Sequence, residues 1–287
     1  MNAPDRRPRR AAYALPTLFT AGNVYLGFYA LLEIFHGAME TLTAVSGAHL
    51  HFRTAAAAIG VAVFLDGLDG RIARLTNTVS EFGREMDSLA DCITFGIAPA
   101  VLAFAWGVEF VAPPQKYINA EQLRNAGYFF SFLYLMCGAA RLARFNIQKN
   151  PVPKNPGRPD RKYFVGMPIP AAASCVAAVV FAFDSTPLSS WPVSVAWLGI
   201  LALLSFLMVS TWRYPSFKDL SLTRPRSPLM FVLLGSLIYL IWTFPRPVLV
   251  AVAVAYVLSG IVIRVGGVVR RTFRSTARSA PVVRPGT

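Results

Sequence analysis

Two short stretches of this sequence concentrate acidic residues that could bind metal ions. The first, FLDGLDGRIARL, contains Asp66 and Asp69, and the second, EFGREMDSLADCITFG, contains Asp87 and Asp91. Aspartates three or four positions apart lie on one face of an α-helix. The sequence therefore predicts two helices, joined by a turn around residues 76–84, whose acidic faces meet.

Four carboxylates at one point would repel one another strongly unless cations or protons neutralised them. Hard divalent cations bind carboxylate oxygens, and two such ions can hold a phosphoryl group between the attacking and leaving oxygens. Gly70 and Ala73, one turn after Asp66 and Asp69, keep the helix surface low, and Arg74 offers a planar cation that suits a phosphate oxygen. The residues thus favour metal-assisted chemistry on a phosphate ester.

The same charges have two other interpretations. The four aspartates could pair with nearby arginines and hold the two helices together, the candidates being Arg71, Arg74 and Arg84. Six of the 14 acidic residues lie between positions 66 and 91, and this concentration favours a site over simple pairing. A transporter also holds carboxylates in a membrane, but it favours ionisable groups near the bilayer centre and broken helices in two similar halves.

The elements that must position these aspartates are expected to be membrane-spanning helices. The chain has 287 residues, of which 55% are hydrophobic and 15% charged, and its mean hydropathy is +0.49. Its apolar segments predict an all-α integral membrane protein with about eight transmembrane helices in a bundle, at residues 16–36, 53–75, 85–107, 126–147, 166–183, 192–212, 228–244 and 246–265. The expected organisation is a basic N-terminus at 1–15, a transmembrane catalytic domain at 16–265 and a basic, disordered tail at 266–287.

The basic residues predict the orientation of the chain. With eight spans, 24 of the 28 Lys and Arg residues fall on the side that holds both termini, and such an excess marks the cytoplasmic side. The aspartates border the same side, so we expect a multi-pass protein of the cell (inner) membrane with its active site at the cytoplasmic face. The net charge of +14 then faces anionic membrane lipids, and no nucleic-acid partner is expected.

The cysteines give no sign of a disulfide framework or a thiolate zinc site. Cys92, Cys137 and Cys175 all fall inside apolar segments, where we expect them to act as small buried hydrophobic residues.

Residues 66–91 read D-x-x-D-G-x-x-A-R-x8-G-x3-D-x3-D, with a match at every fixed position. This pattern resembles the signature of the CDP-alcohol phosphotransferase family. The resemblance implies a cytidine diphosphate-linked donor at the cytoplasmic face, a pair of divalent ions (Mg²⁺ or Mn²⁺) among the aspartates, and an alcohol that attacks the phosphate as CMP leaves. It also implies a homodimer.

Carried over position by position, the resemblance assigns a role to each motif residue. The implied metal ligands are Asp66, Asp69, Asp87 and Asp91, and the CDP moiety is expected to contact Asp66, Gly70, Ala73, Arg74 and Gly83. Asp91 is implied to be the general base as well. A hydroxyl is a poor nucleophile at neutral pH, so a carboxylate within hydrogen-bond reach is chemically what the step needs.

The signature is shared by family members that use different alcohols, so other stretches must indicate the acceptor. LPTLFTAGNVYLGFYAL, DCITFGIAPA, GAARLARFNI and FVGMPIPAAA resemble the members that transfer the phosphatidyl group of CDP-diacylglycerol to L-serine. Members that use glycerol phosphate, inositol phosphate or choline stay as alternatives. An unrelated class that resembles phospholipase D uses an H-x-K histidine, and this is excluded because no lysine follows two residues after any of the histidines, His36, His49 and His51.

A few polar residues outside the motif are candidate substrate contacts. Arg141, Arg144 and Asn146 end a predicted span, where they could hold the carboxylate of serine or a donor phosphate. The two arginines are explained at least as well as anchors at the cytoplasmic boundary. Thr20 and Asn23, near the start of the first span, could reach the same site or could pack between helices without a further role.

Overall fold

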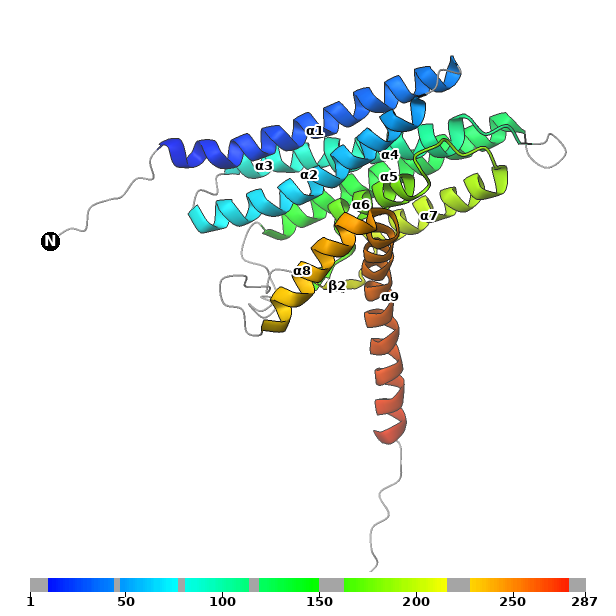
Figure 1. Ribbon diagram of the computed structural model, residues 1–287. Helices are drawn as coiled ribbons and strands as arrows, with labels where there is room; N and C mark the ends of the chain where they lie inside the picture. The colour runs from blue at the N-terminus through cyan, green and yellow to red at the C-terminus, as the bar shows by residue number, and fades with distance from the viewer. Residues whose placement is uncertain are drawn as a thin grey trace, which may run out of the picture.

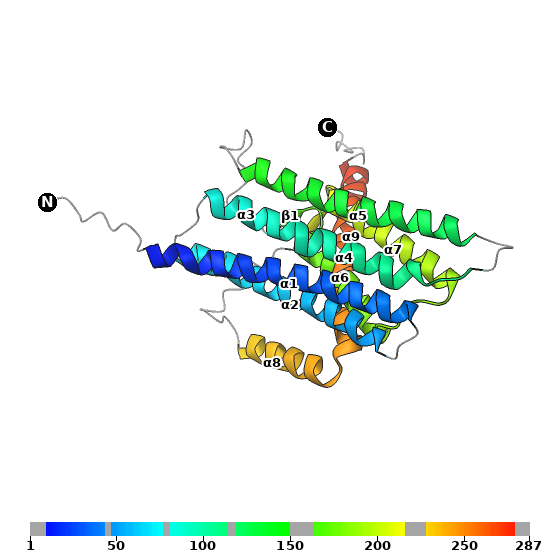
Figure 2. The ribbon, with the colours of Figure 1, turned by 90° about the horizontal axis from the view of Figure 1, so that it is seen from above.

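The computed structural model is a bundle of long helices, with two C-terminal helices that leave the bundle (Figures 1 and 2). It describes residues 10–43, 47–76, 81–113, 119–149, 163–215 and 228–278. The first two helices, α1 (Arg10–Leu42) and α2 (Ala48–Thr76), form an antiparallel hairpin with contacts along its length. Alanines on the buried face of α2, including Ala55 and Ala62, allow this close packing because they add little bulk.

The third membrane segment contains two π-helical turns. It consists of α3 (Glu81–Asp91), the π-helical turn η1 (Cys92–Ile97), α4 (Ala98–Phe104) and the second π-helical turn η2 (Ala105–Glu109). Thr94 in η1 donates its hydroxyl to the backbone oxygen of Asn23 in α1 at 2.9 Å. This contact requires Gly27, because a Cβ atom there would lie 2.5 Å from the Thr94 hydroxyl oxygen. The first π turn is therefore packed directly against α1.

The irregular backbone around the π turns is stabilised by polar side chains of the neighbouring helices α5 (Ala120–Lys149) and α7 (Trp191–Val209). Tyr134 donates to the carbonyl of Phe95 at 3.2 Å, Trp197 donates to that of Ala103 at 2.9 Å, and Ser194 donates to that of Gly107 at 2.6 Å. Backbone groups freed from the helical ladder need such partners inside a membrane, where water is absent.

A small two-stranded sheet pairs two short segments that lie far apart in the sequence. Strand β1 (Tyr163–Val165) pairs antiparallel with β2 (Arg213–Pro215), and α6 (Ile169–Ala182) follows β1. The turn between β1 and α6 depends on Gly166, whose φ of +79° favours glycine and whose added Cβ would lie 2.5 Å from the Met208 carbonyl oxygen. The sequence did not predict these strands, because pairing over three residues depends on contacts between distant segments.

The last two helices, α8 (Pro228–Thr243) and α9 (Pro245–Arg278), lie outside the parallel bundle. Figure 1 shows α9 crossing the bundle direction and projecting away from it. Its first half contacts α6 and β2. Only 6% of its most apolar segment, Pro245–Arg264, is buried.

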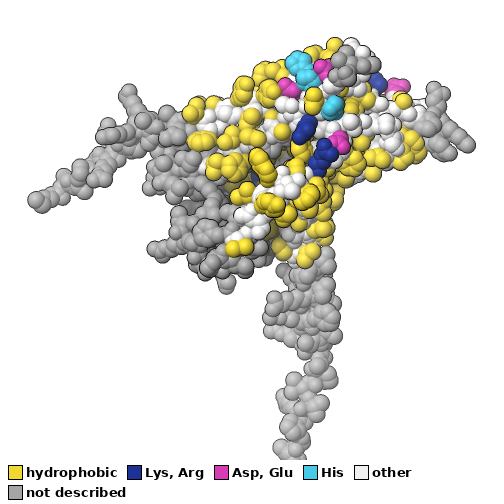
Figure 3. Space-filling view, in the orientation of Figure 1, with side chains coloured by type: hydrophobic (Ala, Val, Ile, Leu, Met, Phe, Trp, Pro, Cys, Tyr) yellow, Lys and Arg dark blue, Asp and Glu magenta, His cyan; other side chains and the backbone are white. Residues whose placement is uncertain are grey.

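Six described segments are long and apolar enough to cross a membrane, namely Leu18–Leu42, Ala48–Leu68, Phe82–Glu109, Ala120–Ile147, Trp191–Val209 and Pro245–Arg264. Hydrophobic side chains also cover much of the described part of the face shown in Figure 3, as expected for helices that face lipid. A multi-pass, mainly helical membrane protein is therefore confirmed, but the count of eight spans is not. The other two predicted spans, 166–183 and 228–244, correspond to α6 with 14 residues and α8 with 16, shorter than the roughly 20 residues of a typical span.

The C-terminal boundary differs from the prediction. Disorder was expected from residue 266, but α9 continues to Arg278. This stretch contains no proline, the residue that disfavours a helix interior most, and its backbone stays helical despite Gly266 and Gly267. Residues 279–287 lie outside the described residues.

Candidate active site

Three of the four motif aspartates converge near one end of the bundle. Asp66 lies in the second half of α2, Asp87 lies in the middle of α3, and Asp91 is its last residue. Each offers a carboxylate oxygen, and these three atoms all lie within 4.8 Å of one another. Asp91 is 9% exposed, and the other two are half-buried. The two helices thus bring three predicted metal ligands to one point.

The rest of the motif is described less completely. Four residues belong to the last two turns of α2, but their side chains fall outside the described residues: Asp69, Gly70, Ala73 and Arg74. Gly83 is half-buried in the first turn of α3. Pairing of the aspartates with Arg71 or Arg74 lies outside the described residues for the same reason, and Arg84 has its Nε 3.8 Å from Glu85.

The donor set formed by Asp66, Asp87 and Asp91 fits a hard divalent cation. Three carboxylates at this separation repel one another, and partial removal from water strengthens the repulsion. A cation that prefers oxygen ligands relieves the repulsion without requiring protonation. The arrangement can therefore hold a divalent ion and, beside it, the negatively charged phosphates of a ligand.

Arg141 adds a positive charge to this group of residues from α5. Its guanidinium interacts electrostatically with both Asp66 and Asp91, and it lies over the ring of Phe145, 5.3 Å from the ring centroid. An arginine held beside carboxylates by an aromatic ring can bind a phosphate or carboxylate of a ligand. The structure thus places Arg141 at the aspartate site.

Arg144 has a different environment. Its two terminal nitrogens donate to the backbone carbonyls of Val209 at 3.2 Å and Val165 at 3.3 Å. These bonds connect the end of α5 to the end of α7 and to β1. The geometry gives Arg144 a structural link, and the substrate contact considered from sequence stays a prediction.

Asn146 and Asn23 are the remaining polar candidates with described neighbours. Asn146 donates to the Ser88 hydroxyl at 2.8 Å, and Ser88 follows Asp87 directly, so this bond fixes α5 against α3 beside a predicted ligand. Asn23 is fully buried in α1, and its side-chain amide has no hydrogen-bond partner among the described residues. Thr20, one turn earlier, is 8% exposed and has a polar partner.

Tyr256 of α9 belongs to the surroundings of the site and was not predicted. It interacts electrostatically with Arg141, and its ring lies 5.5 Å from that of Tyr214 in β2. Burial raises the pKa of Tyr214 to about 12, so this residue stays neutral at physiological pH. A single tyrosine in an apolar helix carries no local signal, because only long-range packing brings α9 near Arg141.

The fold and the aspartate site define a class of protein. A sequence model described as CDP-alcohol phosphatidyltransferase matches residues 13–212, the part that contains all the candidate residues except those of α9. The chain belongs to the CDP-alcohol phosphatidyltransferase family, as its motif indicated.

Curated relatives with similar sequences have names that specify a reaction within this family. A protein of Helicobacter pylori named CDP-diacylglycerol–serine O-phosphatidyltransferase is 36% identical over 241 residues, which cover 84% of this chain and 85% of the relative. A Bacillus subtilis protein of the same name is 31% identical over 204 residues, or 71% of this chain and 91% of the relative. A Methanothermobacter thermautotrophicus protein named archaetidylserine synthase is 30% identical over 204 residues, covering 70% of each chain.

Proposed function

We propose that this protein transfers the phosphatidyl group of CDP-diacylglycerol to the hydroxyl of L-serine, giving phosphatidylserine and CMP. The observation that carries the proposal is the convergence of Asp66, Asp87 and Asp91 within the family motif. The choice of serine is supported by relatives whose names specify it, at 36% and 31% identity over most of the chain.

In the proposed reaction Asp91 accepts the proton of the serine hydroxyl. The serine oxygen forms a bond to the phosphorus that carries diacylglycerol, the bond from that phosphorus to the CMP oxygen breaks, and CMP leaves. No covalent enzyme intermediate is needed. Asp91 suits this role because its carboxylate is largely buried between helices and adjoins both other described aspartates.

Divalent ions, Mg²⁺ or Mn²⁺, held by Asp66, Asp69, Asp87 and Asp91 would neutralise the charge of the donor pyrophosphate linkage and of the phosphate of the departing CMP. Gly70, Ala73, Arg74 and Gly83 form the surface for the CDP moiety in this proposal. In this proposal Arg141 holds the serine carboxylate or a donor phosphate, because its charge interacts with those of Asp66 and Asp91.

The proposed setting is the cell (inner) membrane, with the aspartates at the cytoplasmic face and both termini on that side. The uneven distribution of Lys and Arg supports this orientation. A transmembrane catalytic domain at 16–265 and a homodimer complete the proposal. The homodimer is an expectation taken from the family.

A panel of acceptor alcohols tests the proposed reaction. Purified protein in lipid nanodiscs is incubated with labelled CDP-diacylglycerol and, separately, with L-serine, glycerol 3-phosphate, inositol phosphate or choline. With serine as the acceptor, the expected products are a serine lipid and an equal amount of CMP. With the other alcohols, no lipid product is expected. An Asp91→Asn preparation controls for contaminating enzymes. Efficient turnover with another alcohol and none with serine would show that the acceptor is wrong.

A further inference from the structure

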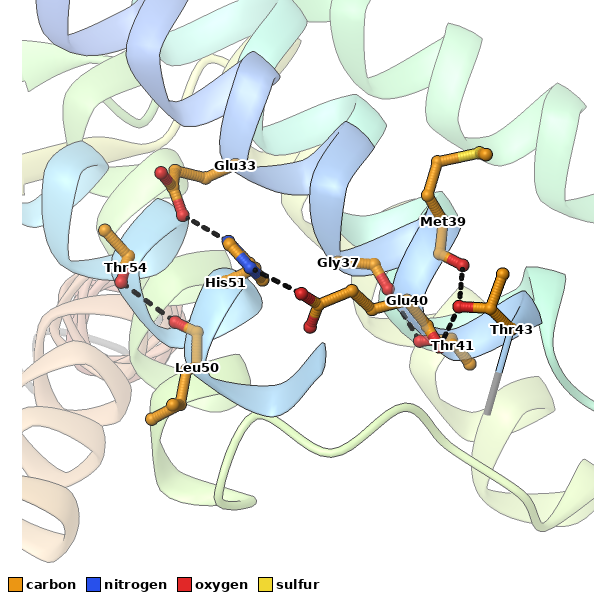
Figure 4. A network of polar contacts seen from close by, with 9 residues as sticks. All are labelled: Glu33, Gly37, Met39, Glu40, Thr41, Thr43, Leu50, His51 and Thr54. Carbon is orange, nitrogen blue, oxygen red and sulfur yellow. Dashed lines mark hydrogen bonds and ion pairs between the residues drawn. The ribbon is translucent and has the colours of Figure 1, made fainter. Parts of the chain in front are cut away.

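A second cluster of possible metal ligands lies in the α1–α2 hairpin, away from the aspartates. It consists of Glu33, His36 and Glu40 on α1 and His51 on α2. Figure 4 shows His51 between the two glutamates, where Nδ1 is 2.7 Å from Glu33 and Nε2 is 3.2 Å from Glu40. Fifteen residues separate His51 from Asp66, which is about 22 Å along the axis of α2. The two clusters are therefore separate sites.

The donor atoms of this cluster suit a transition metal better than Mg²⁺. Glu33, His36 and His51 each offer one ligand atom, and these atoms all lie within 4.8 Å of one another. The imidazole rings of His36 and His51 have centroids 5.6 Å apart and are tilted by 52° with respect to each other. Two imidazole nitrogens with one carboxylate oxygen is a common ligand set for Zn²⁺, whereas Mg²⁺ prefers oxygen ligands alone.

The two ring nitrogens of His51 can both interact favourably with their carboxylate partners only if the ring carries or binds a positive charge. A neutral imidazole has one N–H donor, yet both ring nitrogens of His51 face a carboxylate. A metal ion on the Nδ1 side resolves this, because Nδ1 and Glu33 then share the ion while the Nε2–H donates to Glu40. Histidine ligands in metal sites commonly donate their second nitrogen to a carboxylate in this way.

Two glycines allow α1 and α2 to approach closely enough to form the cluster. A Cβ atom on Gly37, next to His36, would lie 3.2 Å from the Cβ of His51 and 3.1 Å from the ring of Phe52. Gly47 has a φ of +148°, and a Cβ there would lie 3.0 Å from Glu40 Oε2. The start of α2 is thereby positioned so that His51 reaches the ligand face of α1.

We propose that Glu33, His36 and His51 bind a divalent transition metal, with Zn²⁺ as the test ion, and that Glu40 positions His51 through its second ring nitrogen. The ion would join the two helices of the first hairpin near the end of the bundle opposite the aspartates. This site takes no part in the proposed transfer reaction, so its existence does not depend on the transferase assignment.

Direct metal binding tests the proposal. The full-length protein, purified with an affinity tag that lacks histidine and placed in nanodiscs, is titrated with Zn²⁺ in a saturating excess of Mg²⁺ that occupies the aspartates. Calorimetry and elemental analysis are expected to give one Zn²⁺ per chain. Co²⁺ used in place of Zn²⁺ is expected to give a visible absorption spectrum that indicates nitrogen ligands, a readout that does not involve enzyme activity.

Matched variants locate the bound ion. The His36 side chain is exposed. His36→Ala and His51→Ala are expected to abolish Zn²⁺ binding, and Glu40→Gln is expected to weaken it by about 10- to 100-fold. His49→Ala is the control, because this exposed histidine lies two residues before His51 and should bind Zn²⁺ like the unmodified protein. A thermal melt of each variant verifies folding. The proposal is overturned if the unmodified protein binds no Zn²⁺ in excess Mg²⁺, or if a folded His36→Ala variant binds it unchanged.

Discussion

Asp91 is the best-placed of the described aspartates to act on an incoming hydroxyl group. It is the last residue of α3, directly before the π turn, and its side chain is the most buried of the three that converge. A π turn re-aims the side chains around it and occurs often at functional sites. The helix geometry therefore gives Asp91 a setting that differs from those of Asp66 and Asp87.

Asp91→Asn separates proton transfer from binding. Asparagine keeps the volume and one oxygen but accepts no proton, so kcat should fall by about 10²- to 10⁴-fold while the affinity for CDP-diacylglycerol changes little. Donor affinity and serine-dependent CMP release are measured on one preparation. Asp66→Asn is the comparison and should weaken donor or metal binding too. Near-normal turnover in Asp91→Asn would contradict the assigned role.

Removal of divalent ions should abolish activity, because the converged aspartates and the donor pyrophosphate all carry negative charge. Excess chelator is expected to stop CMP release, and added Mg²⁺ or Mn²⁺ to restore it. Ca²⁺ is larger and less demanding of geometry, so it should bind yet support little turnover. Full activity in excess chelator would rule out the metal-assisted reaction.

The two arginines of α5 should respond differently to alanine. Arg141→Ala removes the cation whose charge interacts with Asp66 and Asp91, so substrate binding and turnover should fall while the fold persists. Arg144→Ala removes two hydrogen bonds to backbone carbonyls and should lower stability by on the order of 1 kcal/mol, since the group is partly exposed. Kinetics and thermal melts are measured for both variants. A loss of stability in Arg141→Ala alone, or a loss of turnover in Arg144→Ala alone, would contradict these two roles.

At the scale of the elements, the site depends on how α1 packs against the π turn after Asp91. Gly27→Ala would place a Cβ atom 2.5 Å from the Thr94 hydroxyl oxygen and 2.8 Å from its Cα. We expect a loss of about 1–3 kcal/mol, typical of overpacking, and reduced turnover because η1 must shift. Gly22→Ala on the same helix is the control, since nothing lies within 4 Å of its added Cβ. Equal melting temperatures for the two variants would refute this packing argument.

The sequence predicted those features that depend on residues close together in the chain, and it missed those that depend on contacts between distant segments. The spacing of Asp66, Asp87 and Asp91 predicted a common site because residues on one helix face need only a turn to meet. Tyr256 and the cluster around His51 were missed, since each depends on contacts between distant or separate helices. Apolar runs likewise predicted the helices, whereas the π turns and the short β1–β2 pairing arise from tertiary packing.

At the scale of the whole molecule, hydrogen bonds indicate the path of the chain. Arg144, near the end of α5, bonds to Val165 before α6 and to Val209 at the end of α7. The α6–α7 pair therefore leaves this end of the bundle and returns to it. At its other end, the Leu188 backbone nitrogen donates to the carbonyl of Trp106 at 3.0 Å. These bonds support the proposal that the short helix α6 crosses the membrane, which gives six passes up to Val209 in the proposed topology.

This path leads to a prediction about the termini. In this proposed topology the chain is back on its starting side after six passes, so both termini share one side if α8 and α9 either both cross the membrane or both stay out of it. The excess of Lys and Arg predicts that this side is the cytoplasm. In a variant without the native Cys92, Cys137 and Cys175, single cysteines at Ser46 and at Thr287 are treated in intact cells with a membrane-impermeant thiol reagent. Ser46→Cys, between α1 and α2, should be labelled at once, and Thr287→Cys only after the cells are lysed. Labelling of Thr287→Cys in intact cells would mean that one of the last two helices crosses the membrane alone.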